Sequence, residues 1–502
     1  MKGVIVYMRK AGILLPVTAL PSKYGIGCFS KEAYDFIDRL CEAGQSYWQV
    51  LPLGHTSYGD SPYQSFSSFA GNPYMISLEE LTDEGILSEK ECENADFGKI
   101  KDCIDYEKIY YSRYPLLKKA YERSDIQSDS NYRRFEDENS DWLEDYALFM
   151  SIKEHFNQKP LDAWEEDIRK KSPEAVAEYK EKLFSEIGFW KFVQYKFFYQ
   201  YGKLKEYAKK NGIGIIGDIP IYTAADSADV WANPKLFQLD EDLRPEYVAG
   251  CPPDGFSAEG QLWGNPLYKW EEHKSDDFKW WKKRLKHSFD MYDVLRIDHF
   301  RGFDEYYSIK YGSKNAVKGE WKKGPGIELF NAVEGSIGKK EVIAEDLGYI
   351  TDSVRKLVTD TGYCGMKVLE FAFDSRDTGA ANDYLPHNYI NNCVVYTGTH
   401  DNQTLVSWFD TISPEEKITV RNYLCDYYTP DEKIYMPIIC LAMQSPANLC
   451  VIPMQDWLGL DDKARINIPS TIGKNWCWRL KDNEFSKDIA NEIKRITKRY
   501  SR

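Results

Sequence analysis

The chain has 502 residues and a formal net charge of −14. An acidic chain repels the phosphate backbone of nucleic acids, and no long basic run offsets this, so we expect no nucleic-acid partner. No stretch approaches the roughly 18 apolar residues that a membrane-spanning helix needs, so we also expect no membrane association. The length suits several ordinary domains or one α/β barrel with long insertions, and the pattern of elements must decide between them.

Eleven cysteines are present, an odd number, and none forms a CxxC pair or another spacing typical of metal ligands. The simplest interpretation is scattered reduced thiols in a cytosolic protein. The short apolar run at residues 4–7 is followed by Arg9 and Lys10, and it lacks the length and the cleavage site of a signal peptide. We therefore expect a cytoplasmic location.

Short apolar runs bounded by turn residues recur along the chain, a pattern typical of parallel strands buried on both faces. Eight of them lie at residues 12–15, 47–53, 214–219, 294–297, 341–345, 366–371, 392–396 and 448–453. Helical patterns fall between several of these runs, at residues 31–43, 201–211, 277–291 and 352–361. Ser30 is the expected N-cap of the first helix, and Gly44, Gly212 and Gly362 follow three of the helix ends. Alternating β/α units in this number predict a closed (β/α)8 barrel, the TIM barrel.

Two gaps between the expected strands are too long for plain connections. Residues 71–195 are rich in Glu, Lys, Asp and Tyr with helical periodicity, which predicts a mainly helical insertion subdomain. Residues 220–276 are rich in Gly, Pro, Asp and Trp, which predicts an irregular loop region at the active face, with residues 252–264 as a lid. We expect residues 1–502 to form one elaborated barrel, closed by a C-terminal helix at 488–500 and without a C-terminal β-domain.

An acidic segment follows the fourth expected strand, at the end where the active sites of such barrels lie. Residues 296–303 read RIDHFRGF, so Arg296 and Asp298 alternate onto one face. An arginine beside a carboxylate keeps it ionised, as a nucleophile at an anomeric carbon requires. A structural Arg–Asp pair is the alternative, and the flanking His299 and the position at a strand end count against it.

Two more acidic segments follow expected strands. Glu345 and Asp346 come after the fifth strand, and Asp401 comes after the seventh, beside His400. A glutamate in such a place acts as a general acid/base if burial or a neighbouring anion raises its pKa. The alternatives are an acidic pair at a helix N-terminus for the first segment and an Asx-type turn for the second.

Asp298, Glu345 and Asp401 are more informative together than singly. Their spacings match one and two βα units, which places them at the same end of one barrel. Opposed carboxylates around a glycosidic bond cleave it with retention: one attacks, and one protonates the leaving oxygen and then deprotonates the acceptor. A metal site built from His299, His400 and the acids is the rival interpretation, but the HxH and HxxxH spacings typical of metal ligands are absent.

Several further stretches, in this order, resemble one known family: the 4-α-glucanotransferases, also called amylomaltases or disproportionating enzymes, of glycoside hydrolase family 77. The resemblance covers nearly the whole chain, from Leu15 to Arg479. Besides the three acidic segments, the stretches are LPVTALPS at 15–22, GDSPYQS at 59–65, GDIPIY at 217–222, PPDGFS at 252–257 and GQLWG at 260–264.

The resemblance implies a role for each motif position. Asp298 would be the nucleophile, Glu345 the acid/base, and Asp401 the group that stabilises the distorted ring in the transition state. The implied substrate-binding residues are Tyr63, Ser61, Asp218, Trp263, Arg296, His299, Asp346, His400 and Asn467. Tyr58 resembles a position linked to a second, remote glucan site. The family needs neither a metal ion nor an organic cofactor, and it acts on malto-oligosaccharides and on glucans derived from starch or glycogen.

Transfer of α-1,4-glucan segments between sugar chains is the function that the resemblance implies. From the residues alone, an α-amylase-like hydrolase on the same barrel stays open, because water and a sugar 4-hydroxyl compete for the intermediate. A lid at 252–264 would favour transfer by excluding water, although the same stretch also fits a rigid structural loop. A non-catalytic glucan-binding protein is disfavoured, since it would be expected to have lost one or more of the acids. The sequence indicates neither an oligomeric state nor a preferred chain length.

Overall fold

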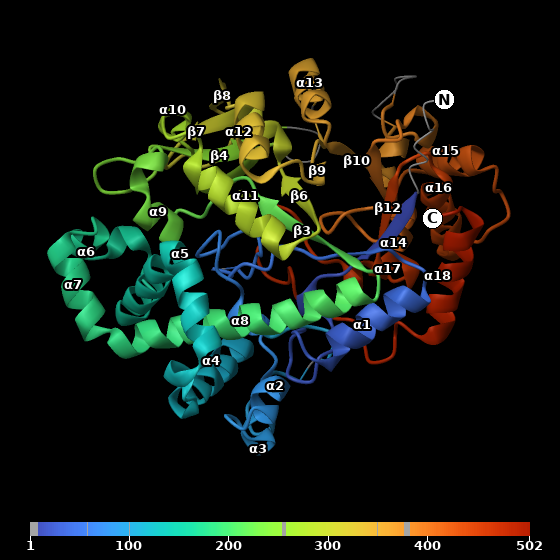
Figure 1. The fold of residues 1–502 in the computed structure, drawn as a ribbon. Coiled ribbons are helices and arrows are strands. Elements are labelled where there is room, and N and C mark those ends of the chain that lie inside the picture. Colours follow the sequence, from blue (N-terminus) through green and yellow to red (C-terminus); the bar gives the residue numbers. More distant parts are fainter. Residues whose placement is uncertain (1–8, 58, 100, 254–257, 349, 376–381) are drawn as a thin grey trace, which may run out of the picture.

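The computed structural model describes residues 9–57, 59–99, 101–253, 258–348, 350–375 and 382–502 (Figure 1). Eight parallel strands form a closed barrel in the spatial order β1-β12-β11-β10-β9-β6-β3-β2. These strands are β1 (Lys10–Leu14), β2 (Tyr47–Gln49), β3 (Gly214–Pro220), β6 (Val294–Asp298), β9 (Val342–Ala344), β10 (Cys364–Val368), β11 (Cys393–Tyr396) and β12 (Leu449–Pro453). Each strand overlaps one of the eight apolar runs, and the predicted (β/α)8 barrel is confirmed.

The interior of the barrel is a packed core to which every barrel strand contributes. Its buried side chains are Leu14, Tyr47, Ile216, Val294, Ile343, Met366, Val368, Val394, Tyr396, Leu449 and Val451. The intervening side chains, such as Ile13, Trp48 and Leu295, are buried on the outer face of the strands. Because both faces are covered, the strands read as continuous apolar runs rather than as alternating ones.

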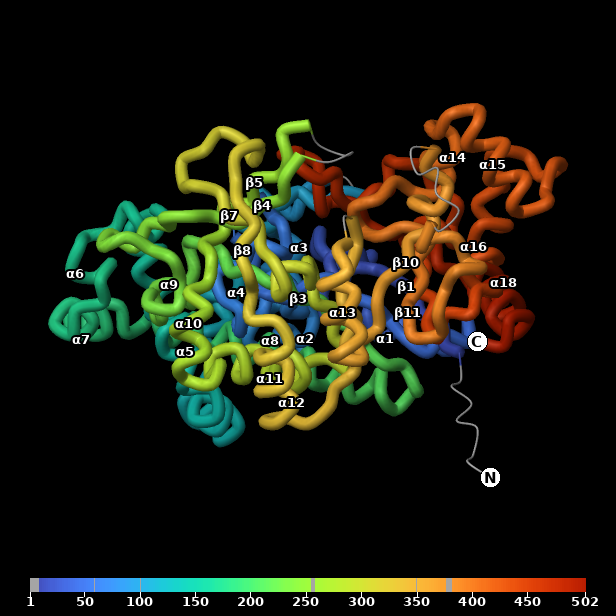
Figure 2. The backbone as a smooth tube through the Cα atoms, turned by 90° about the horizontal axis from the view of Figure 1, so that it is seen from above, coloured from blue at the N-terminus to red at the C-terminus, as the bar shows by residue number. Residues whose placement is uncertain are grey.

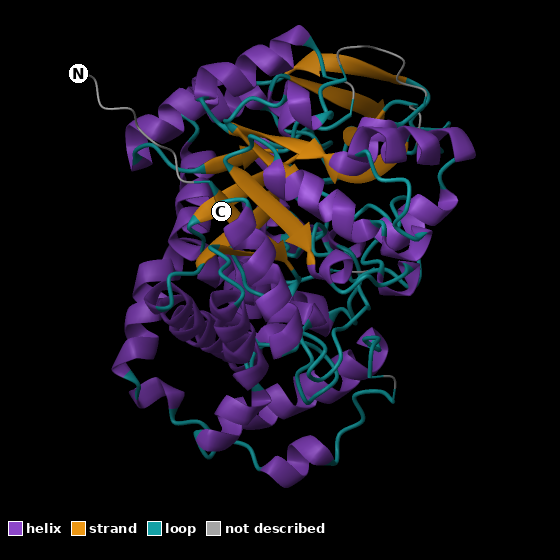
Figure 3. Ribbon diagram, turned by 90° about the vertical axis from the view of Figure 1, so that its right-hand side faces the viewer, coloured by secondary structure: helices purple, strands orange, loops and turns teal. Residues whose placement is uncertain are grey.

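Helices surround the strands on the outside (Figure 3). Outside residues 71–276, these helices are α1 (Lys31–Glu42), α11 (Lys279–Met291), α12 (Ile327–Ile337), α13 (Asp352–Thr361), α14 (Leu405–Thr411), α15 (Pro414–Leu424), α16 (Tyr435–Gln444), α17 (Met454–Trp457) and α18 (Lys487–Arg499). The four predicted helices that correspond to α1, α11, α13 and α18 agree with them within two residues at each end. Between β10 and β11 the described residues hold two short 3-10 turns, Leu369–Phe373 and Pro386–Asn388, and no α-helix.

Residues 71–195 carry helices that lie to one side of the barrel (Figure 1). They are α2 (Leu78–Asp83), α3 (Glu89–Glu93), α4 (Tyr106–Arg123), α5 (Ser130–His155), α6 (Glu166–Arg169), α7 (Pro173–Lys182) and the first part of α8 (Phe184–Lys210). With 27 residues, α8 is about 40 Å long. It starts among the inserted helices and ends beside α1, directly before β3. One continuous helix therefore joins the insertion to the barrel.

A second, antiparallel sheet corrects the expectation of irregular structure at residues 220–276. Its strands, in the order β5-β4-β7-β8, are β4 (Tyr247–Cys251), β5 (Gln261–Pro266), β7 (Glu305–Lys310) and β8 (Gly319–Lys323), which Figure 2 shows as one group. The same stretch also contains α9 (Ala228–Ala232) and α10 (Trp270–Ser275). The strands were missed because they are short and because β4 pairs with β7, which lies outside the stretch.

No helix among the described ranges is long and apolar enough to cross a membrane.

Gly217 leaves the space that the ring of Tyr292 occupies against β3. A Cβ at position 217 would lie 2.1 Å from Cγ of Tyr292, and this tyrosine is buried. We expect Gly217→Ala to lower the free energy of unfolding by about 1–3 kcal/mol, the usual cost of overpacking, as measured by denaturant unfolding. Gly202→Ala in α8 is the control, because its Cβ would meet nothing within 4 Å and alanine favours a helix. Equal losses in both variants would contradict the packing argument.

Candidate active site

Four acidic side chains lie at the carboxyl ends of barrel strands. Asp218 belongs to β3, Asp298 ends β6, Glu345 follows β9, and Asp401 lies in the connection after β11. Because parallel barrel strands all end at the same mouth, these side chains share one face of the barrel. The contacts of Arg296, His299 and Tyr63 join them into one site.

Arg296 links Asp298 to Asp218. Its Nη2 donates to Oδ1 of Asp298 at 2.9 Å, and its Nη1 donates to Oδ2 of Asp218 at 2.6 Å. Burial alone would lower the pKa of Arg296, but the charges of Asp218 and Asp298 raise it well above its ordinary value. The side chain of Asp298 is still 31% exposed. Asp298 is thus oriented by a permanent cation and remains accessible to a ligand.

Glu345 is held by backbone donors on both oxygens. The N–H of His299 donates to Oε2 at 2.7 Å, and the N–H of Leu347 donates to Oε1 at 2.9 Å. Burial, and next the charge of Asp298, raises the pKa of Glu345 to about 7, against the opposing effects of Arg296 and the two backbone donors. A carboxyl group that titrates near neutrality both gives and takes a proton, as a general acid/base must.

His299 adopts a left-handed backbone conformation, with φ at 51°. This conformation is uncommon outside glycine and is typical of functional sites. The turn puts the His299 N–H on Glu345, one residue after Asp298. The imidazole lies against the ring of Trp263 in a T-shaped contact with centroids 4.7 Å apart. Burial lowers the pKa of His299 to about 4, so the neutral ring can both donate and accept hydrogen bonds at neutral pH.

Asp401 is contacted by Asn467 and His400, which the family resemblance assigns to the site, and by Arg465. Asn467 Nδ2 donates to Oδ1 of Asp401 at 2.6 Å, and His400 Nε2 lies 3.4 Å from the same oxygen. Arg465 Nη2 donates to the backbone carbonyl of Asp401 at 2.6 Å. The carboxylate is 45% exposed, so it is fixed in direction and open to solvent.

Tyr63 forms an aromatic wall with His400 and Trp476. Its ring stacks on His400 with centroids 5.1 Å apart and an angle of 18°, and Trp476 lies 5.9 Å away. Its hydroxyl donates to Oδ2 of Asp218 at 2.8 Å. A flat aromatic ring with a fixed edge is suited to cover the apolar face of a sugar.

Removal of the Tyr63 hydroxyl tests how much this hydrogen bond contributes. We expect Tyr63→Phe to lower kcat/KM for maltotriose by about fivefold to tenfold, the upper part of the usual range for one hydrogen bond. The ring stays on His400, so Tyr63→Ala should lose considerably more. Steady-state kinetics of wild type, Tyr63→Phe and Tyr63→Ala test this expectation. Equal kcat/KM values for wild type and Tyr63→Phe would contradict a contribution from the hydroxyl.

The other predicted site residues lie close by in supporting positions. Asp346 Oδ1 accepts from the N–H of Met366 on β10 at 2.7 Å, and burial raises the pKa of Asp346 to about 6. Ser61 Oγ accepts from the N–H of Tyr63 at 3.3 Å. Their substrate-binding roles stay predictions. Tyr58, and residues 254–257 of the predicted lid, lie outside the described residues.

Two neighbours of the site, Trp476 and Arg465, were not singled out in the sequence. Both come from the segment after β12, where no strand end marks a functional position. The aromatic pair Trp476 and Trp478 is the one sequence signal there that would have drawn attention to it.

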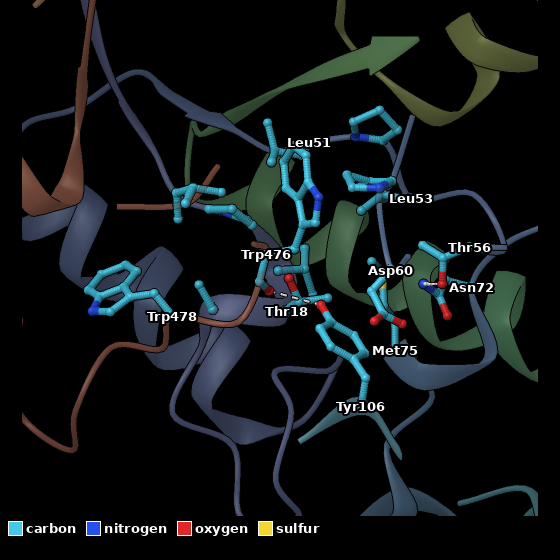
Figure 4. A pocket seen from close by; sticks show the side chains of 16 residues that line it. Thr18, Leu51, Leu53, Thr56, Asp60, Asn72, Met75, Tyr106, Trp476 and Trp478 are labelled. Carbon is cyan, nitrogen blue, oxygen red and sulfur yellow. Dashed lines mark hydrogen bonds between the residues drawn. The ribbon is translucent and has the colours of Figure 1, made fainter. Parts of the chain in front are cut away.

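A pocket adjoins the aromatic wall on the side of Trp476 (Figure 4). Its lining comes from residues 16–19 and 51–53, from Tyr106 of α4, and from Thr56, Asp60, Pro62, Asn72, Met75, Ile466, Trp476 and Trp478. The Tyr106 hydroxyl donates to the carbonyl oxygen of Trp476 at 2.9 Å. The inserted helices therefore help to hold the wall in place.

Within the described parts of the chain, no three His, Cys, Asp or Glu side chains are grouped in a way that could hold a metal ion.

This fold and this site together define an enzyme that acts on glycosidic bonds: a TIM barrel with an oriented carboxylate, a carboxyl of near-neutral pKa and a third exposed acid at one mouth. The family model described as 4-alpha-glucanotransferase, glycoside hydrolase family 77, matches residues 15–485. The chain belongs to this family, as its motifs predict.

Individual relatives agree over their whole length. The 4-alpha-glucanotransferase of Clostridium butyricum is 48% identical over 488 residues, which cover 97% of this chain and 99% of the relative. That of Thermus thermophilus is 44% identical over 495 residues, 97% of each chain. The structure of amylomaltase from Streptococcus agalactiae in complex with acarbose is similar with a TM-score of 0.94 and 41% identity, covering 98% of this chain and 99% of that one.

Proposed function

We propose that this site transfers α-1,4-glucan segments by a double displacement that retains the anomeric configuration. In the first step the Asp298 carboxylate attacks C1 of the donor sugar, the C1–O4 bond breaks, and the proton of Glu345 goes to the leaving oxygen. In the second step Glu345 takes the proton of an acceptor 4-hydroxyl, the new C1–O4 bond forms, and Asp298 leaves. Each step is a single substitution, so two inversions give net retention.

The main support for this proposal is the hydrogen bond between the residues that follow β6 and β9. The His299 N–H, one residue after Asp298, donates to Glu345 at 2.7 Å. The two carboxyl groups are therefore neighbours in different surroundings: Arg296 orients Asp298 through a hydrogen bond, and burial raises the pKa of Glu345 to about 7. A part-exposed carboxylate fixed by an arginine, next to a buried carboxyl group with a raised pKa, suits a nucleophile and its acid/base partner.

The remaining residues are assigned to the donor sugar and its neighbours. Asp401 stabilises the oxocarbenium-like transition state through sugar hydroxyls, fixed by Asn467 and His400. Tyr63 stacks on the donor sugar, and Trp263 and His299, which pack against each other, also line the sugar site. Arg296, Asp218, Ser61 and Asp346 are likewise assigned to substrate binding, Asp218 together with Tyr63, whose hydroxyl it binds.

The substrates we propose are malto-oligosaccharides and glucans derived from starch or glycogen. The support is the family itself and the acarbose complex of the Streptococcus agalactiae relative. A cytoplasmic location, and the absence of a nucleic-acid partner, stay predictions from the composition of the chain.

Incubation with maltotriose tests transfer directly. Glucose and a ladder of longer malto-oligosaccharides should appear, while the number of reducing ends stays constant, because every bond broken is replaced by a bond formed. An α-amylase-like hydrolase would instead raise the number of reducing ends with time and make no longer products.

A further inference from the structure

Strand β10 leads into an acidic side chain that the mechanism above does not use, Glu370. Unlike Asp298 and Asp401, it is buried, with 6% of its surface exposed. Its Oε2 accepts from Nδ2 of Asn402 at 2.9 Å. Its Oε1 lies against Gly398, where an added Cβ would come within 2.8 Å of it. Glu370 is therefore packed under the connection that follows β11 and carries Asp401.

A chain of hydrogen bonds runs from Glu370 to the backbone of Asp401. Asn402, held by Glu370, accepts with its Oδ1 from the N–H and the hydroxyl of Thr399, at 3.0 and 2.9 Å. The Thr399 oxygen in turn accepts from the N–H of Asp401 at 3.3 Å. Glu370 is thus connected to the backbone of Asp401 through the side chains of Asn402 and Thr399, which belong to the same tight turn as Asp401.

Asp456 and Asp462 fix the ends of this connection but not its centre. Asp456 accepts from the Thr397 hydroxyl at 2.5 Å and from the Leu405 N–H at 2.8 Å. Asp462 accepts from the Thr404 N–H at 3.0 Å. Between these ends, Glu370 holds the turn at Thr399–Asn402 by its hydrogen bond to Asn402. Arg465 and Asn467 hold the same turn by their hydrogen bonds to Asp401.

The surroundings indicate that Glu370 acts as a neutral group. Burial, and next the charge of Asp456, raises its pKa well above its ordinary value, while Asn402 and Arg465 oppose this and Asp462 adds to it. A neutral carboxyl offers Asn402 an acceptor without placing a further negative charge near Asp401. Its contribution is then the shape of the turn and one hydrogen bond, which an amide of the same size can supply.

We propose that Glu370 is a positioning residue for the transferase reaction, which holds Asp401 in its working orientation through Asn402 and Thr399. This inference rests on the role of Asp401 in the proposed function.

The test compares Glu370→Gln with Glu370→Ala. Glutamine keeps the shape and the acceptor, so kcat for maltotriose should stay within about threefold of wild type with an unchanged pH profile. Alanine removes both, and a displaced Asp401 should lower kcat by about 10- to 100-fold with a much smaller change in KM, because the loss falls on transition-state stabilisation.

A double-mutant cycle shows whether Glu370 acts through Asn402. Asn402→Ala should lower kcat about as much as Glu370→Ala, and the double variant should be no worse than either single one, since the same connection is broken once. Gln200→Ala is the control. Gln200 is also buried and hydrogen-bonded to an irregular backbone segment, at Ser77, but it lies in α8 and contacts none of the active-site residues that the structure describes, so Gln200→Ala should lose stability without losing kcat.

Two results would overturn the inference: a Glu370→Gln variant as impaired as Glu370→Ala, or additive losses in the double variant. If Glu370→Ala does not fold, kcat of Glu370→Gln must still stay within about threefold of wild type, and Asn402→Ala must still lower kcat by about 10- to 100-fold; failure of either overturns the inference. Asp401→Asn separates the two levels of the argument. A fully active Asp401→Asn enzyme contradicts the proposed role of Asp401, whereas an inactive one beside a fully active Asn402→Ala enzyme contradicts only the role of Glu370.

Discussion

Asp298→Asn is expected to lower kcat for maltotriose disproportionation by about 10⁴-fold or more while the protein stays folded. The amide has the size of the carboxylate but lacks its charge and its nucleophilicity, so the glycosyl-enzyme cannot form. The fold should survive because the side chain is part-exposed and because Arg296 keeps its ion pair with Asp218. Product analysis by chromatography gives the rate, and circular dichroism and thermal unfolding check the fold.

The controls for Asp298 separate the loss of a nucleophile from the loss of a charge. Asp304→Asn removes a carboxylate from the same connection, where it accepts from the Ser353 hydroxyl at 2.6 Å, and should leave kcat unchanged. In Asp298→Ala, azide should attack an activated α-maltosyl fluoride in the vacated space and give the β-azide, a single inversion. Recovery of the α-azide, or high activity of Asp298→Asn, would contradict the assignment.

The barrel and the three acids could be predicted from the sequence because the burial of each parallel strand marks both the strand and the position of the side chain that follows it. A parallel strand buried on both faces must be a continuous apolar run, and the side chain that follows it at its carboxyl end meets the common mouth. Asp298, Glu345 and Asp401 each follow such a run, so locating the strands located the acids. The predicted strand at 366–371 begins two residues after β10 begins and ends three residues after β10 ends, because the apolar residues Leu369 and Phe371 continue the run into a 3-10 turn.

Other parts of the site could not be predicted because they depend on contacts between distant segments. Trp476 reaches Tyr63 only through the path of the chain after β12, and Tyr106 supports it from an inserted helix. Nothing local to either residue indicates this pairing. The antiparallel strands β4 and β7 likewise pair with each other although β5 and β6 lie between them in the sequence, and neither has a long apolar run of its own.

The proton affinity of Glu345 is a further property that only the assembled site contains. A glutamate titrates near 4.3 in isolation, and here burial and the charge of Asp298 raise its pKa to about 7. When Asp298 becomes esterified in the first step, its charge disappears and the pKa of Glu345 should fall. The same residue is then an acid before the intermediate and a base after it, without any movement of the chain.

Glu345→Gln should therefore have effects that depend on the leaving group. Maltotriose needs its leaving oxygen protonated, so kcat should fall by about 10²- to 10⁴-fold. An α-maltosyl fluoride needs no such proton, so Asp298 should still displace fluoride in a fast burst, after which the intermediate accumulates because no base activates the acceptor. Fluoride release measured by stopped flow shows the burst. Glu341→Gln, at the amino end of the same strand, is the control and should behave as wild type.

The pH dependence of the wild-type enzyme follows from the same raised pKa. Glu345 must carry its proton when the donor bond breaks, and with a pKa of about 7 it holds the proton below pH 7 and loses it above. The first step on maltotriose should accordingly slow as the pH rises through 7. With the fluoride donor this alkaline decline should vanish, as it should in Glu345→Gln. An alkaline limb that persists with the fluoride donor would assign the titration to another group and remove Glu345 from the role of acid.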